Sequence, residues 1–60
     1  MDIIEMGAAI KRARLAKQLS QDDLCKAVEL ARPTLSKLEN GRLPELGMRK
    51  IMNLCERLGM

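Results

Sequence analysis

The stretch that decides the fold of this chain is SQDDLCKAVELARPTLSKLENG, which runs from Ser20 to Gly41. Its pattern predicts two short helices joined by a tight turn. Ser20 is followed by Asp22 and Asp23, and a serine before acidic residues is typical of a helix start. The serine hydroxyl accepts hydrogen bonds from free backbone N–H groups, and the carboxylates face the positive end of the helix dipole. We therefore expect the first helix to begin directly after Ser20.

The first helix has one short apolar face. Leu24, Cys25 and Val28 follow the helical period, so they lie on one side of a helix that is about two turns long. Leu19, before the cap, and Leu24 also occupy the positions of a hydrophobic staple. This helix is therefore expected to pack against a core through that face.

Pro33 marks the beginning of the second helix. Proline has no N–H group and fixes φ, so it is excluded from a helix interior but is favoured in a first turn. The second helix is therefore expected to begin near Arg32. Leu35 and Leu38, three residues apart, form its buried side, and Asn40-Gly41 supplies a left-handed stop.

The residues left on the outer side of the second helix are small, polar or basic. The major groove of B-DNA is wide enough to admit a helix. Arginine and lysine can bond the O6 and N7 acceptors of guanine, and threonine can meet a base edge or a thymine methyl group. We therefore predict that this helix reads base pairs through Arg32, Pro33, Thr34 and Lys37.

Together these residues resemble the lambdoid phage repressor and Cro type of helix-turn-helix, also called XRE-like. The resemblance covers about Met6 to Gly59, and it rests on Gln21, Leu24, Val28, Leu30, Thr34, Leu35 and the segment Leu38-Glu39-Asn40-Gly41. It implies an all-α, lambda-repressor-like, compact bundle of four or five short helices. The bundle would form a single domain over residues 1–60 with its motif at 20–41, and the second motif helix would lie in the major groove.

The resemblance implies roles for residues around the motif as well. Arg14 occupies the position that pairs with the glutamate of the LENG segment, which implies an ion pair between Arg14 and Glu39; the alternative is two unrelated surface charges. Gln21 and Asn40 could be no more than a helix-start residue and a C-cap, and Arg42 a solvated loop charge. We nevertheless expect DNA phosphate contacts from Gln21, Ser36, Asn40, Arg42 and Lys17.

Three positions depart from the family pattern. Glu29 stands where glycine is usual, and a left-handed conformation there would cost about 1 kcal/mol. Ala31 stands where a capping serine or threonine is usual, and Cys25 replaces a small alanine. The turn between the two helices is therefore expected to be either altered or strained.

Two further helices are expected to flank the motif. The first covers about residues 3–17 and has an inner stripe of Ile3, Met6, Ile10 and Ala13. The last covers about residues 48–58 and follows a loop that contains Pro44. Its apolar stripe is wide enough to cover a core and to leave an edge for a partner. That spare apolar surface is expected at Met52, Leu58 and Met60.

Composition narrows the function. The chain has a net charge of +3 and contains no histidine and no aromatic residue. Eight basic and four acidic residues lie between Lys11 and Arg42, which suits a polyphosphate ligand, although a solvated surface gives the same count. Cys25 and Cys55 have no CxxC spacing, so we expect buried thiols in a reducing cytosol. We therefore predict a cytoplasmic protein that is not an enzyme and needs no cofactor or metal.

A chain with these properties is expected to be a transcriptional repressor. It would bind, as a homodimer, a double-stranded DNA operator with two half-sites about 34 Å apart. The alternative is an antitoxin that sequesters a toxin protein and also binds its own operator. No apolar stretch is long enough to cross a bilayer, so no membrane contact is expected. The chain could be a complete small regulator or one domain of a longer protein.

Overall fold

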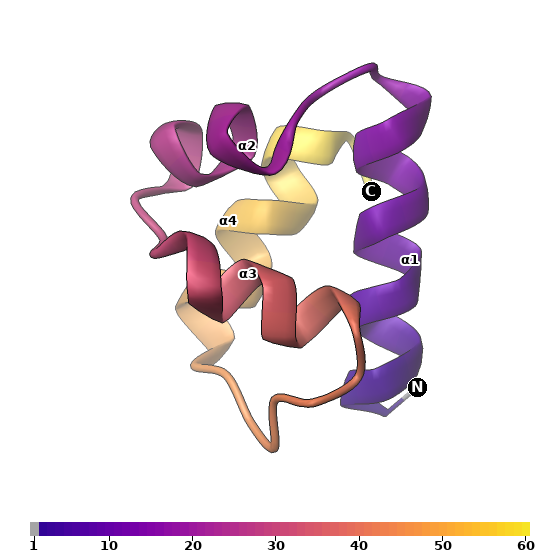
Figure 1. The fold of residues 1–60 in the computed structure, drawn as a ribbon, viewed down its shortest axis with the longest axis vertical. Helices are drawn as coiled ribbons and strands as arrows, with labels where there is room; N and C mark the ends of the chain where they lie inside the picture. The colour runs from indigo at the N-terminus through magenta and orange to yellow at the C-terminus, as the bar shows by residue number, and fades with distance from the viewer. Residues whose placement is uncertain (1) are drawn as a thin grey trace.

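The computed structural model describes residues 2–60, which form four α-helices and no strand (Figure 1). These elements confirm the predicted all-α class. The first helix ends one residue earlier than expected, and the last helix has the predicted bounds. The helices are α1 (Ile3–Ala16), α2 (Gln21–Val28), α3 (Arg32–Glu39) and α4 (Met48–Leu58).

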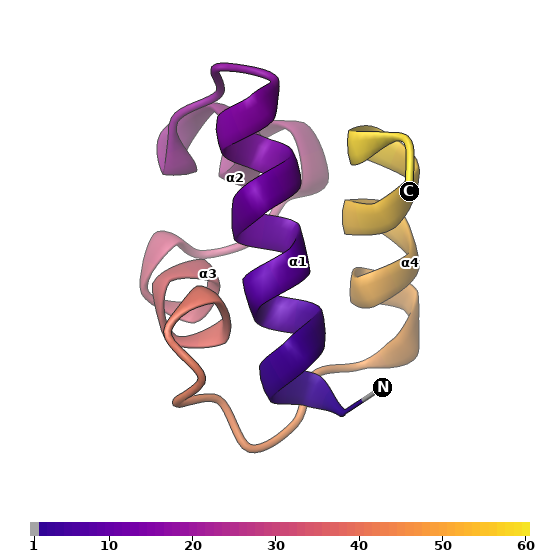
Figure 2. The same cartoon turned by 90° about the vertical axis from the view of Figure 1, so that its right-hand side faces the viewer.

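The four helices form two pairs. α1 and α4 stand side by side and run in the same direction, whereas α2 and α3 lie across them (Figures 1 and 2). The described chain is compact, with extents of 25 × 19 × 19 Å. Because α3 packs against both α1 and α2, its inner side is covered and its outer side faces solvent.

The core is aliphatic and draws on every helix. The side chains that are fully shielded from solvent are Ile10, Leu24, Leu35, Leu38 and Leu54. Leu58 belongs to this core as well, with only 4% of its surface exposed. The prediction that Leu58 is spare surface was therefore wrong, because it follows Leu54 by four residues and so lies on the same face of α4.

Glycine at position 7 lets α1 and α3 meet at their backbones. A Cβ atom on Gly7 would lie 1.9 Å from the carbonyl oxygen of Leu38 and 2.8 Å from its carbonyl carbon. Both are backbone atoms, which cannot move aside as the end of a flexible side chain can. Nothing in the sequence pattern pointed to this contact, because a glycine inside a helix is usually only a weak helix former.

The turn between α2 and α3 is left-handed at Glu29. This residue has φ 54° and ψ 48°, so the strained alternative of the sequence prediction is the one the chain adopts. The backbone N–H groups of Glu29 and Leu30 both reach the carbonyl oxygen of Cys25, which closes the end of α2. Buried Leu30 then anchors the turn in the core. Gln18, between α1 and α2, also has a positive φ of 58°, which was not predicted.

Both ends of α3 lie where the sequence predicts them. Ala31 makes no side-chain hydrogen bond at the N-terminus of α3, and Pro33 occupies its first turn. At the other end, Gly41 has φ 70°, and the N–H of Arg42 donates to the carbonyl of Lys37 at 2.9 Å. The chain then continues through a loop to Gly47, which precedes α4.

None of the helices described between residues 2 and 60 is long and apolar enough to cross a membrane.

Gly7→Ala should destabilise the domain by about 1–3 kcal/mol, because the new methyl group overlaps the backbone of α3. On an open helix surface the same substitution would stabilise by about 1 kcal/mol. Thermal or urea unfolding measures the difference. Gly47→Ala is the comparison, since a Cβ there meets no atom within 4 Å and only the smaller loss of a glycine at the N-cap of α4 is expected. A Gly7→Ala variant as stable as the wild type would contradict the close approach of α1 and α3.

Glu29→Gly should stabilise the domain by up to about 1 kcal/mol, because glycine adopts the left-handed conformation without a steric cost. Glu29→Ala removes the same charge but keeps a Cβ atom, so we expect no comparable gain from it. Urea unfolding of the two variants separates backbone strain from charge. Equal stability of the two variants would show that the turn stores no strain.

Candidate nucleic-acid interface

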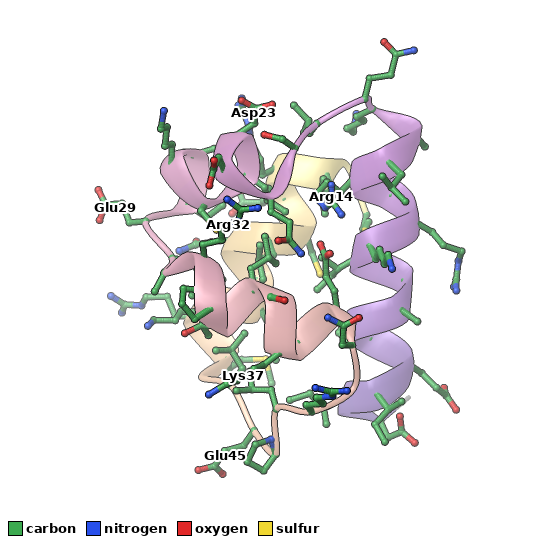
Figure 3. The ribbon with its side chains drawn as sticks, viewed as in Figure 1. Arg14, Asp23, Glu29, Arg32, Lys37 and Glu45 are labelled. Carbon is green, nitrogen blue, oxygen red and sulfur yellow. The ribbon has the colours of Figure 1, made fainter. Side chains whose placement is uncertain are left out.

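The outer side of α3 carries a line of exposed polar and basic residues. Pro33, Lys37 and Asn40 follow one another at spacings of four and three, and all three are exposed. Arg32 lies at the edge of α3 beside α2, whereas Lys37 lies at the opposite edge (Figure 3). Because no other described element covers this line, the α3 surface is open to a large ligand.

Other predicted contact residues are less exposed. Thr34 and Ser36 are both half-buried. The side-chain amide of Asn40 donates to the backbone carbonyl of Ser36 at 2.8 Å, and its nitrogen lies 3.4 Å from the hydroxyl oxygen of Ser36. The amide of Asn40 therefore points toward the preceding turn of α3. A partner at this end of the helix would contact it together with Arg42.

A buried ion pair ties α3 to α1. Nε of Arg14 lies 2.7 Å from Oε2 of Glu39, and Nη2 of Arg14 donates to Oε1 of Glu39 at 3.0 Å. Only 8% and 1% of the two side chains are exposed. The bidentate hydrogen bond to Glu39 raises the pKa of Arg14 above its usual value, so the guanidinium stays charged despite its burial.

Two more hydrogen bonds extend this network to α2. The side-chain amide of Gln21 donates to Oε1 of Glu39 at 3.0 Å, and Nη1 of Arg14 donates to the carbonyl oxygen of Leu19 at 2.7 Å. The network thus joins α1, the start of α2 and the last residue of α3. It sets the orientation of α3 relative to the remainder of the domain.

Gln21 was predicted to contact a phosphate, and its amide faces Glu39 instead. The sequence reading missed this partner because Gln21 and Glu39 are 18 positions apart and nothing local signals their contact. A phosphate contact from Gln21 stays a prediction. It would use the N-terminal end of α2, where backbone N–H groups favour anions.

The structure does not bring Lys17 to the α3 surface. Lys17 follows the last turn of α1, and its Nζ lies 4.0 Å from the position of a Cβ built on Gly59, at the end of α4. Arg42, in contrast, is exposed directly after α3 and lies close to Lys37 through its backbone hydrogen bond. The exposed basic residues on α3 and directly after it are therefore Arg32, Lys37 and Arg42.

The start of α2 is closed by a reciprocal pair of hydrogen bonds. Oγ of Ser20 accepts from the N–H of Asp23 at 3.0 Å, and Oδ2 of Asp23 accepts from the N–H of Ser20 at 2.9 Å. The backbone N–H of Ser20, and after it the side chain of Ser20, lower the pKa of the Asp23 carboxyl group. The expected serine cap is present, and Asp23 is its second half.

The two thiols differ in their surroundings. Cys25 is buried in the core, and burial, followed by the nearby charge of Asp22, raises the pKa of its thiol. Cys55 is only half-buried, on α4. The expectation of buried thiols is therefore confirmed for Cys25 and was wrong for Cys55.

Ser20→Ala removes the hydroxyl group but keeps the backbone N–H, so it should return the pKa of Asp23 only part of the way to its ordinary value of 3.8. Because the folded pKa is lowered, the wild type gains stability above pH 3.8 and loses it as the pH falls through the folded pKa. The stability difference between wild type and Ser20→Ala should therefore shrink in acid. NMR titration of the Asp23 carboxyl group measures the pKa directly. Ser36→Ala removes a hydroxyl elsewhere and should leave that titration unchanged.

Comparison with known proteins identifies the family. A family model described as a helix-turn-helix domain matches residues 4–60. Comparisons with curated proteins and with solved structures gave no significant match. The family match agrees with the two crossed helices, their left-handed turn and the exposed side of α3, and it does not separate the phage repressor type from other types. The chain therefore belongs to the helix-turn-helix domain family, and is a DNA-binding domain.

Proposed function

We propose that this domain is a transcription regulator, acting as a repressor, that binds double-stranded DNA sequence-specifically with α3 in the major groove. One observation carries the proposal. The buried network of Arg14, Gln21 and Glu39 fixes α3 from its inner side, while Pro33 and Lys37 on its outer side remain exposed. A helix held in one orientation with a polar outer line can present its side chains to base edges.

The base contacts that we propose come from the first two turns of α3. Lys37 and Arg32 have the donors that guanine O6 and N7 require, and each good contact would contribute about 1–3 kcal/mol of discrimination. Pro33 and Thr34 offer apolar groups to a thymine methyl. Thr34 is half-buried, whereas Pro33 and Lys37 are exposed. Thr34 would therefore contact a base only at the edge of the groove.

Phosphate contacts would hold the domain in register. Arg42 and Asn40 lie together at the end of α3, and Ser36 lies one turn before Asn40. Gln21 would contribute from the start of α2. Lys17 lies beside the end of α4, so its contact would require the DNA to reach a second side of the domain.

We further propose that the protein binds its operator as a homodimer. Met48 and Met52 are the most exposed large apolar side chains of α4, with Met48 69% exposed, and Met60 is exposed nearby in the sequence. Two copies joined through this surface would place two α3 helices on half-sites about 34 Å apart. Leu58 takes no part, since it lies in the core.

Selection of bound sequences from random DNA tests the base contacts. The wild type should enrich a two-fold symmetric site. Lys37→Ala should lose the preference at one base pair in each half-site, by about 5-fold to 100-fold, and retain its fold as judged by circular dichroism. Lys50→Ala, on exposed α4, makes the same change of charge and should keep the preference. Unchanged selectivity of Lys37→Ala would remove this residue from the interface.

Salt dependence tests whether phosphate contacts hold the complex. A dimer with about eight such contacts should bind about 10³-fold to 10⁵-fold more weakly at 200 mM than at 50 mM salt. A flat response would argue against DNA as the ligand. Recovery of a stoichiometric protein partner, together with weak operator binding, would favour the antitoxin alternative over a repressor.

A further inference from the structure

An exposed ion pair joins the start of α2 to the start of α3. Nη1 of Arg32 lies 3.4 Å from both carboxylate oxygens of Asp22. The two side chains are 63% and 59% exposed. The pair therefore lies on the surface, at the edge of α3 beside α2 (Figure 3).

The position of Arg32 at the positive end of the α3 dipole explains why a nearby carboxylate stabilises its charge. Arg32 is the first residue of α3, where the helix dipole is positive and disfavours a cation. Ala31 provides no capping side chain, and the first turn of α3 contains no acidic residue. Asp22, from the neighbouring helix, is the carboxylate that compensates this charge.

The pair uses only one end of the guanidinium group. An arginine side chain has five N–H donors in a rigid plane, and Asp22 engages those on Nη1 alone. The donors on Nε and Nη2 remain for a second planar acceptor, such as the O6 and N7 edge of guanine. A guanidinium held at one end loses less rotational freedom when its other end binds a base.

We propose that Asp22 is a specificity-determining residue, which positions Arg32 so that its remaining donors meet one base pair of the operator. This inference rests on the proposed function. Asp22 also places a negative charge beside the DNA backbone, where it weakens binding to any sequence. Asp22 therefore raises discrimination between base pairs while it lowers the affinity for DNA of any sequence. Its removal should lower the discrimination and raise that affinity.

Asp22→Asn tests this proposal because it keeps the shape of the side chain and removes the charge. Arg32→Ala first identifies the base pair that Arg32 reads, as the position whose preference it abolishes in a selection from random DNA. At that base pair, Asp22→Asn should lower the preference by about twofold to fivefold, the range of an exposed ion pair. Binding to unrelated DNA should become tighter, because a negative charge near the phosphates is removed.

Three further variants complete the test. Glu5→Gln makes the same change of charge on the exposed side of α1, away from the proposed dimer surface, and should leave the preference intact. Asp22→Glu keeps a carboxylate and should restore part of the preference. The double variant Asp22→Asn/Arg32→Ala should show the same base preferences as Arg32→Ala alone, because Asp22 affects the preference only through Arg32.

Several outcomes would overturn the proposal. One is an unchanged preference in Asp22→Asn at the base pair that Arg32→Ala relaxes. Another is an equal loss at every base pair together with a lower melting temperature, which would indicate a structural role in α2. If the wild type selects no sequence at all, the proposed function fails and this inference fails with it. If the wild type is selective but Arg32→Ala leaves every preference intact, the proposed function survives and the role of Asp22 does not.

Discussion

The remainder of the structure depends on one buried ion pair, between Arg14 and Glu39. Burying two charges is favourable only when hydrogen bonds satisfy them, and leaving one charge without its partner costs about 3–5 kcal/mol. Here Glu39 accepts from Arg14 and Gln21, and Arg14 also donates to Leu19. Among residues 2–60, no buried side-chain nitrogen or oxygen lacks a partner. The main effect of the pair is therefore to fix how three helices are oriented relative to one another. Its contribution to net stability is the smaller effect.

A 60-residue domain without aromatic residues needs such a geometric constraint. A chain of this length buries only about 60% of the surface of its unfolded state, so its aliphatic core has little stability in reserve. Aliphatic side chains pack without strong directional preferences. The directional elements are the ion pair, which holds the end of α3 laterally, and the backbone contact at Gly7, which sets its distance from α1. Together they leave α3 little freedom to rotate or shift.

Much of the fold could be predicted because its signals are local. The cap at Ser20, the proline at the start of α3 and the glycine after it each act within a few residues, and the helix bounds follow from them. The close approach at Gly7 and the partner of Gln21 could not be predicted, because both depend on how distant segments pack. Leu58 was misassigned since an apolar stripe does not reveal which edge is covered. The contacts with bases and phosphates stay predictions, because they depend on a ligand.

The burial of Cys25 has a practical consequence. A domain without tryptophan or tyrosine cannot be followed by its intrinsic fluorescence, but it contains two thiols in unequal surroundings. Cys25 lies in the core next to the turn between α2 and α3, and a thiol reagent reaches it only when that region opens. Half-buried Cys55 reacts without such an opening and serves as the internal reference. The ratio of the two labelling rates therefore reports, in the wild-type protein and without an engineered residue, how often the DNA-binding motif opens.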